Sequence, residues 1–183
     1  MAAASGWRSA STLKPGDLVW TFDRGLQPLA DLRLRARWQH ADGDPRAYIV
    51  PEGALANGRD IVLPAHQGLL LECEKASDAM GDPFAVIPVE ALDGVVGISV
   101  YAPEPDEVLI TPVFAGEEVI YIDSGLLLHC PDPECTRGVT APRYDVLSVE
   151  KARALMTDLD LAELALREPE DVIVEAVCQQ NTA

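Results

Sequence analysis

Residues 14–25 read Lys-Pro-Gly-Asp-Leu-Val-Trp-Thr-Phe-Asp-Arg-Gly, a short apolar stretch enclosed by two turns. Pro15 restricts its own φ angle and Gly16 supplies a permissive corner, so the first four residues are a turn signal. Residues 18–22 are aliphatic, β-branched or aromatic, as strand residues commonly are. Residues 23–25 then close the apolar stretch. The sequence here predicts a strand that runs from a turn into a hairpin.

Similar short apolar runs recur along most of the chain. We expect them at residues 32–38, 47–50, 60–63, 68–72, 84–89, 95–101, 107–114, 118–122 and 126–128. Roughly ten short strands, separated by turns every 8–12 residues or so, are typical of a closed or sandwiched body. The sequence therefore predicts a mostly β fold, a compact arrangement of many short strands.

Two segments have a periodicity of their own. Residues 32–38 alternate apolar residues with arginines, which predicts a strand with one buried face and one wet face. Near the C-terminus, Val149, Ala152, Leu155 and Met156 share one helical face. A helix N-cap pattern at residues 157–160 begins a second helical stretch, which Pro169 ends. We expect a β domain over residues 1–146 and a helical appendage, residues 147–183, packed on it.

Charge limits the classes of partner. The chain has 14 basic and 30 acidic residues, a formal net charge of -16. Nucleic acid and anionic membranes need basic residues, so neither is an expected partner. No apolar run approaches the ~20 residues of a membrane helix, and the first residues do not resemble a signal peptide. Four cysteines are too few for a disulfide scaffold. A cytoplasmic location is the default expectation, and no cofactor is implied.

Histidine and cysteine mark the places where chemistry could reside. His66 lies on a tight turn between two apolar strands, where flanking backbone would hold it in place. His129, Cys130 and Cys135 form a His-Cys-x4-Cys arrangement that would hold zinc with one further ligand. Because structural zinc sites usually use two close pairs and Cys178 stands alone, unligated thiols are the favoured interpretation.

The frame around these residues resembles bacterial Hint (hedgehog/intein-type) domains, the autoprocessing and protein-splicing modules. Residues 13–29 resemble the family's Leu-x-Pro-Gly-Asp-x-Val-x-Thr-x-Asp-x-Gly-x-x-Pro segment, and residues 54–71 resemble its block with a Pro-x-His turn. Residues 86–92, 117–125 and 147–156 are similar to three later blocks. The five blocks occur in order over residues 6–156. The resemblance implies a Hint-like β fold.

The family's chemistry begins when an N-terminal Cys or Ser attacks the preceding carbonyl, an acyl shift helped by proximity, proton donation and oxyanion stabilisation. By the resemblance, His66 is the remnant proton donor. Leu63 stands where relatives often have a Ser or Thr donor, and Glu117 stands where many have a second His. The nucleophile would lie upstream of Met1.

Three hypotheses remain open. The first is a Hint-like domain that does not self-cleave and acts as a binding or structural module for an unidentified protein partner or flanking domain. The second is a fragment of an active domain, in which an upstream Cys or Ser acts with His66, Glu117, and Asp17 or Asp23. The third is a metal-binding β protein that uses His129, Cys130 and Cys135. We expect the first, because nucleophile, oxyanion donor and late His are all missing.

Overall fold

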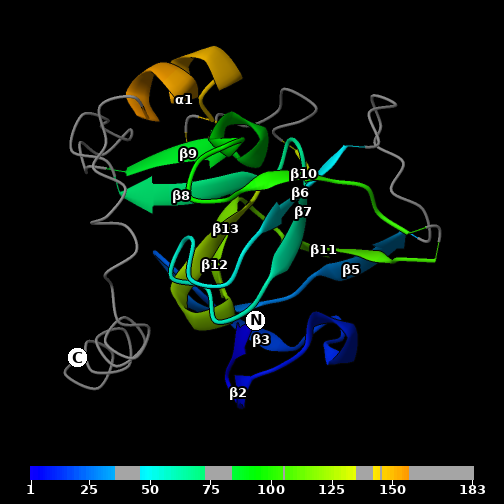
Figure 1. Ribbon diagram of the computed structural model, residues 1–183. Coiled ribbons are helices and arrows are strands. Elements are labelled where there is room, and N and C mark those ends of the chain that lie inside the picture. Colours follow the sequence, from blue (N-terminus) through cyan, green and yellow to red (C-terminus); the bar gives the residue numbers. More distant parts are fainter. Residues whose placement is uncertain (36–45, 73–83, 105, 135–141, 145, 157–183) are drawn as a thin grey trace.

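A computed structural model describes residues 1–35, 46–72, 84–104, 106–134, 142–144 and 146–156 (Figure 1). These residues form a mostly β fold of short antiparallel strands with one short C-terminal helix. The predicted fold class is therefore confirmed. No helix in this part of the chain has the length and apolarity that crossing a bilayer requires.

The largest sheet has eight strands. Seven of them follow the order β2-β1-β3-β12-β13-β8-β9, and the eighth, β4, lies off this path and pairs with β3. The strands are β1 (Ala2–Ala3), β2 (Gly6–Trp7), β3 (Leu18–Thr21), β4 (Gly25–Pro28), β8 (Gly68–Glu72), β9 (Phe84–Pro88), β12 (Glu118–Ile122) and β13 (Leu126–Cys130). The strand predicted from residues 14–25 is β3, and its closing turn leads into β4 as expected. The sheet thus brings segments more than 90 residues apart into neighbouring positions.

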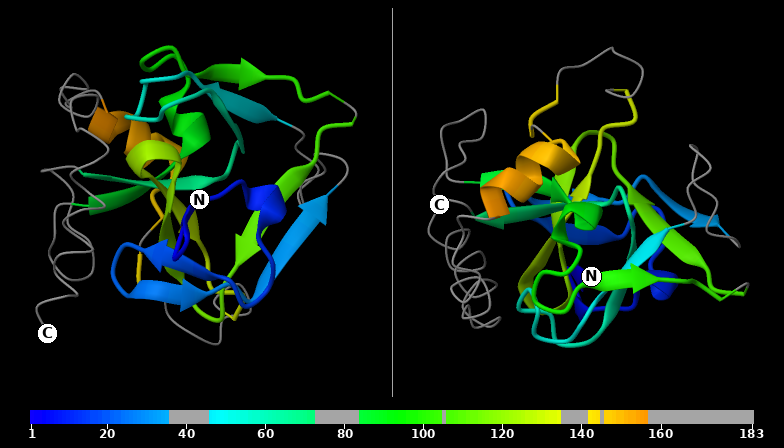
Figure 2. Two further views of the ribbon diagram at one scale, coloured as in Figure 1. Left: turned by 90° about the horizontal axis from the view of Figure 1, so that it is seen from below. Right: turned by 45° about the horizontal axis from the view of Figure 1, so that its top comes forward.

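Two smaller sheets complete the β structure. One has three strands in the order β10-β6-β7, namely β10 (Ser99–Tyr101), β6 (Ala47–Val50) and β7 (Ile61–Pro64). The other is a ribbon of two strands, β5 (Asp31–Arg35) and β11 (Leu109–Val113). In both views of Figure 2 this ribbon lies on the side of the molecule away from α1.

Helical structure is sparse among the described residues. It consists of three short 3-10 turns, η1 (Ala10–Thr12), η2 (Val89–Leu92) and η3 (Asp123–Gly125), and of the helix α1 (Val149–Met156). The predicted helix is confirmed: α1 packs on η2 and β9, and Ala152 is fully buried against the core. The second helical stretch, from residue 157 onward, lies outside the described residues.

The core is mostly aliphatic, with Tyr48 and Phe114 as its large aromatic members. Its largest fully buried side chains come from the eight-stranded sheet, from β6, from η2 and from connecting residues: Tyr48, Phe114, Leu29, Leu69, Ile87, Leu92, Ile98, Ile120, Val19, Val50, Val86 and Val89. Burial of such side chains is the main stabilising contribution to a fold of this size.

Two expectations about strands are corrected. Residues 95–98 do not belong to a strand, because Val96 and Gly97 both have positive φ angles, and β10 begins only at Ser99. The alternating segment does form β5, but its apolar face is not buried throughout, since Leu34 is 63% exposed. Alternation predicted the strand correctly over residues 32–35 and the burial of Leu34 wrongly. Residues 36–38 of the predicted strand lie outside the described residues.

Candidate functional site

The hairpin of β12 and β13 brings an acidic residue and a histidine together. Val119 pairs with His129 in the antiparallel register, so Glu117, just before β12, lies diagonally opposite His129 on the same face. Glu117 Oε1 and His129 Nε2 are 2.7 Å apart. Their side chains are only 8% and 6% exposed. The result is a buried, hydrogen-bonded carboxylate–imidazole pair.

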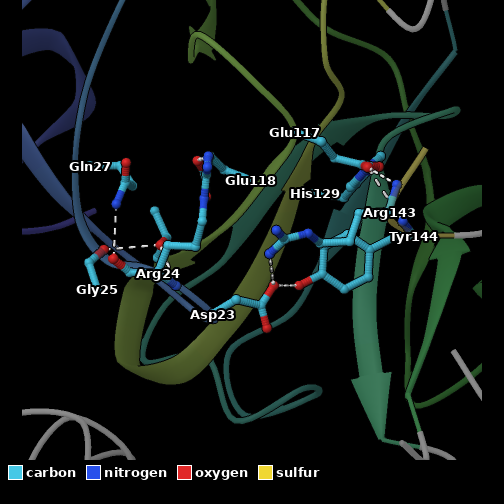
Figure 3. A network of polar contacts seen from close by, with 10 residues as sticks. Asp23, Arg24, Gly25, Gln27, Glu117, Glu118, His129, Arg143 and Tyr144 are labelled. Carbon is cyan, nitrogen blue, oxygen red and sulfur yellow. Dashed lines mark hydrogen bonds and ion pairs between the residues drawn. The ribbon is translucent and has the colours of Figure 1, made fainter. Parts of the chain in front are cut away.

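The second oxygen of Glu117 anchors a segment that comes from beyond the hairpin (Figure 3). The backbone N–H groups of Arg143 and Tyr144 both donate to Glu117 Oε2, the latter over 3.3 Å. The Tyr144 ring meets the His129 ring edge to face, with centroids 6.1 Å apart. Glu117 therefore ties residues 143 and 144 to the hairpin and has both oxygens engaged.

Asp23 and Arg24, in the turn between β3 and β4, add a second layer of contacts. Asp23 accepts a hydrogen bond from the Tyr144 hydroxyl and pairs with the Arg143 guanidinium at 3.4 Å. Arg24 binds both carboxylate oxygens of Glu118, whose side chain is 3% exposed. Bidentate pairs of this kind are the stronger class of ionic contact. These contacts join the turn between β3 and β4, the β12–β13 hairpin and residues 143–144. We call their members the Glu117 network: Asp23, Arg24, Glu117, Glu118, His129, Arg143 and Tyr144.

Gly68 gives His129 the space it occupies. A Cβ atom on Gly68 would lie 3.3 Å from His129 Nδ1 and 2.6 Å from Val86 Cγ1, closer than carbon atoms pack. Gln67, just before β8, also holds the backbone of the histidine, because Gln67 Nε2 donates to the His129 carbonyl over 2.7 Å. The sequence Gln67-Gly68 at the start of β8 therefore positions the imidazole from its other side.

The Glu117 network is suited to holding structure and poorly suited to catalysis. A general acid or base must come within hydrogen-bond reach of a substrate group. The imidazole and the carboxylate are both more than nine-tenths buried and bind each other. Removing one member of a buried pair typically costs about 3–5 kcal/mol, because the other is left without compensation. The arrangement therefore fits a structural role, in which the pair holds neighbouring segments together.

The structure brings some of the predicted site residues together and places others apart. Asp23 and Glu117 both belong to the Glu117 network. Asp17 instead closes the turn before β3: its carboxylate accepts from the Lys14 N–H and pairs with Arg8 at 3.2 Å. The role of Asp17 seen here is to shape that turn.

His66 lies on the turn that joins β7 to β8, and its side chain is exposed. The turn is held by its backbone, since the Gln67 N–H donates to the Pro64 carbonyl over 2.9 Å and the Glu90 N–H donates to the Ala65 carbonyl over 3.0 Å. The Leu63 side chain, at the position where relatives often have a donor, is buried in the core.

The candidate zinc ligands are only partly described. His129 and Cys130 are consecutive in β13, so their side chains point to opposite faces of the sheet. Burial raises the pKa of the Cys130 thiol to about 12, and its Sγ atom lies 3.9 Å from the Leu128 carbonyl oxygen. Cys135 lies outside the described residues. Within the described ranges, no three His, Cys, Asp or Glu side chains gather as metal ligands would.

Sequence reasoning missed the pairing of Glu117 with His129, although a signal for it exists. Strands were expected at residues 118–122 and 126–128, and counting outward from Ser124, midway between them, makes 117 and 129 diagonal neighbours. Arg143 and Tyr144 have no such signal, because they follow a long connection and bind through backbone N–H groups.

Comparison of this chain with family models, with curated proteins and with solved structures finds no match. The resemblance to Hint domains therefore depends on the five sequence blocks alone.

Proposed function

We propose that this chain is a Hint-like domain that does not self-process and serves as a binding or structural module. The ordered sequence blocks support the family. The proposed loss of processing depends mainly on Glu117, which stands at the position where many relatives have a second His. Both of its oxygens are engaged in buried contacts, one with His129 and the other with two backbone N–H groups.

Leu63 supports the same proposal. An acyl shift needs hydrogen-bond donors aimed at the developing oxyanion. Leu63 cannot donate, and its side chain is 7% exposed as part of the main hydrophobic core. A polar replacement there would have to bury a hydroxyl among aliphatic side chains, which is unfavourable without a partner. Leu63 therefore contributes to the packing of the core and supplies no hydrogen-bond donor.

A release assay tests the proposal. A reporter peptide fused ahead of Met1 is incubated with hydroxylamine or a thiol, which would cleave any ester or thioester formed at the junction. We expect no peptide to be released. Release that disappears in His66→Ala would contradict the proposal, since it would show that the histidine still protonates a leaving amide. Circular dichroism of both proteins checks that each is folded.

A second fusion separates the proposal from the hypothesis of an active fragment. Here the upstream peptide carries a Cys, which supplies the nucleophile that the active hypothesis requires. Release from this fusion, sensitive to His66→Ala, would favour the active fragment. No release supports our proposal, because then a nucleophile alone does not compensate for Leu63 and Glu117.

A further inference from the structure

The loop between β6 and β7 contains an Asn-Gly pair, Asn57 and Gly58. In such a pair the backbone nitrogen of the glycine readily attacks the side-chain amide carbon of the asparagine, because glycine has no side chain to hinder the approach. The chain has two asparagines, Asn57 and Asn181, and only Asn57 precedes a glycine. The loop therefore holds the asparagine that is most prone to spontaneous deamidation.

Packing accounts for the glycine at position 58. Its φ angle is not positive, so the backbone itself does not require glycine there. A Cβ atom on residue 58 would, however, lie 2.7 Å from Ser124 Oγ, closer than a Cβ atom packs. The close approach of this loop to the turn between β12 and β13 thus explains why the chain keeps a labile pair.

The side chain of Asn57 is held by its own loop. Its Nδ2 group donates to the carbonyls of Pro51 and Arg59 over 2.8 and 2.7 Å, and its Oδ1 accepts from the Leu55 N–H over 3.0 Å. To form a ring with the next nitrogen, the amide must turn away from these partners and leave buried groups unpaired. The folded loop therefore opposes deamidation from the asparagine side.

Asp123, from the turn between β12 and β13, holds the attacking nitrogen. The Gly58 N–H donates to Asp123 Oδ2 over 2.7 Å, and Asp123 Oδ1 pairs with Arg59 Nε at 3.1 Å. The nitrogen must lose its proton to attack, and a carboxylate beside it disfavours the negative charge that this creates. Gly58 is otherwise exposed, so hydroxide from the solvent reaches it once the hydrogen bond to Asp123 opens.

We infer that the Asn57-Gly58 pair is a covalent modification site that Asp123 protects, and that it deamidates when the loop opens. The Gly58 nitrogen loses its proton and bonds to Asn57 Cγ, and the Cγ–Nδ2 bond breaks. The departing NH2 group takes up a proton and leaves as ammonia. Water then opens the resulting succinimide at either carbonyl, which gives aspartate or isoaspartate. The inference goes beyond the proposed function and does not depend on it.

The modified loop cannot close as before. Aspartate at position 57 has no Nδ2 donor for the Pro51 and Arg59 carbonyls, and it places a negative charge beside them. Isoaspartate lengthens the backbone next to Ala56, which already has a φ angle of 58°. The reaction is therefore permanent, and the modified fraction increases with the time that the loop has spent open.

Rates of deamidation in the folded and the unfolded protein test the inference. The full chain is incubated in mildly alkaline buffer with and without guanidinium chloride, and the tryptic peptide of residues 47–59 is followed by mass spectrometry. We expect deamidation to be at least about a hundredfold faster in denaturant, because opening breaks several hydrogen bonds of the loop. Equal rates would overturn the inference. This comparison needs no substitution, so it does not depend on how well any variant folds.

Variants separate the effect of Asp123 from a general loss of stability. Asp123→Ala should speed deamidation of the folded chain about tenfold, equivalent to about 1.4 kcal/mol. Asp123→Asn keeps an oxygen that accepts from the Gly58 N–H and should stay close to the original rate. Gly68→Ala is the matched control, because it disturbs β8 and leaves the Asp123 contact in place. If Asp123→Ala were no faster than the original chain, or no faster than Gly68→Ala, Asp123 would not be the protecting group.

A paired change identifies the attacking nitrogen. Ser124→Gly removes the atom that a methyl on residue 58 would meet, so Gly58→Ala becomes tolerable in that background. In denaturant the paired variant should deamidate about tenfold more slowly than Ser124→Gly alone, since the methyl hinders attack by its own nitrogen. An unchanged rate would mean direct hydrolysis of the Asn57 amide and would contradict the succinimide route.

The products distinguish this inference from the proposed function. Hydroxylamine also cleaves a succinimide, but the fragment then begins at Gly58 and differs in mass from a released reporter peptide. Reporter release contradicts only the proposed loss of processing and leaves the modification site unaffected.

Discussion

Asn57 shows how one buried amide can hold a loop. Its side-chain N–H groups donate to the carbonyls of Pro51 and Arg59 over 2.8 and 2.7 Å, and its side-chain oxygen accepts from the Leu55 N–H over 3.0 Å. The residue is 2% exposed. The amide therefore satisfies several backbone groups of the loop between β6 and β7, a task that needs donors and an acceptor on one side chain.

Asn57→Asp should destabilise the fold strongly at neutral pH. The change keeps the shape but replaces the donor by a carboxylate oxygen that faces carbonyls, and it buries a charge without a partner. We expect the free energy of unfolding to fall by about 3–5 kcal/mol, measured by urea denaturation. Gln27→Glu is the control, because Gln27 makes an exposed contact with the Arg24 carbonyl. A similar small loss in both variants would contradict the role given to Asn57.

Cys130 should be almost inert in the folded protein. Burial raises the pKa of its thiol from 9.0 to about 12. Since the thiolate is the reacting species, its alkylation near pH 8 should be about 1,000-fold slower than that of an unfolded cysteine.

The measurement uses a chain in which Cys73, Cys135 and Cys178 are replaced by Ser, so that only Cys130 can react. Iodoacetamide labelling, followed by mass spectrometry, should be slow in buffer and fast in denaturant. Fast labelling of the folded chain would show that the thiol is accessible and that β13 opens readily.

At the scale of the element, β8 and the hairpin of β12 and β13 are fitted to each other through Gly68. Gly68→Ala should destabilise the fold by about 1–3 kcal/mol, the usual cost of overpacking, because the new methyl meets Val86 and His129. Gly116→Ala is the matched control: its nearest neighbour would be Arg24 Nη2 at 3.6 Å, an ordinary contact. Thermal unfolding measures both. Equal midpoints for the two variants would show that β8 can shift without loss.

The elements were largely predictable from sequence, whereas their contacts were not. Turn residues and apolar runs placed β3, β8 and β12 correctly because these signals are local. The error at residues 95–98 arose because Val96 has β propensity but adopts a positive φ angle between two glycines. Leu34 was expected to be buried because alternation reports a strand's two faces and not what covers them.

In the candidate site, too, individual residues were predictable from the sequence and their contacts were not. Asp23 and Glu117 were chosen for their places in family-like blocks, and the structure does bring both into one network. Their common partners, Arg143 and Tyr144, lie 120 and 121 residues from Asp23 in sequence, a separation at which local patterns carry no information. His129 was considered as a candidate metal ligand, though not the favoured interpretation, because its neighbour in sequence is a cysteine; neighbours in a strand face opposite ways.

At the scale of the whole molecule, the net charge of -16 opposes compaction. Several arginines offset this locally, as Arg8 does with Asp17 and Arg59 does with Asp123 at 3.1 Å. Salt screens both effects: the Debye length falls from about 30 Å at 0.01 M to about 8 Å at 0.15 M. Repulsion among many carboxylates acts over longer distances than these contact pairs, so screening should relieve it more.

Moderate salt should therefore stabilise the chain. Raising NaCl from about 10 to 200 mM should raise the thermal midpoint by about 2–4 °C, equivalent to ~1 kcal/mol for a protein of this size. The gain should level off once the Debye length is shorter than the spacing of surface charges. The charge reversal Arg33→Glu, Arg35→Glu makes the chain more acidic, so its midpoint should depend more steeply on salt. A midpoint that falls with salt would show instead that close ion pairs outweigh the long-range repulsion.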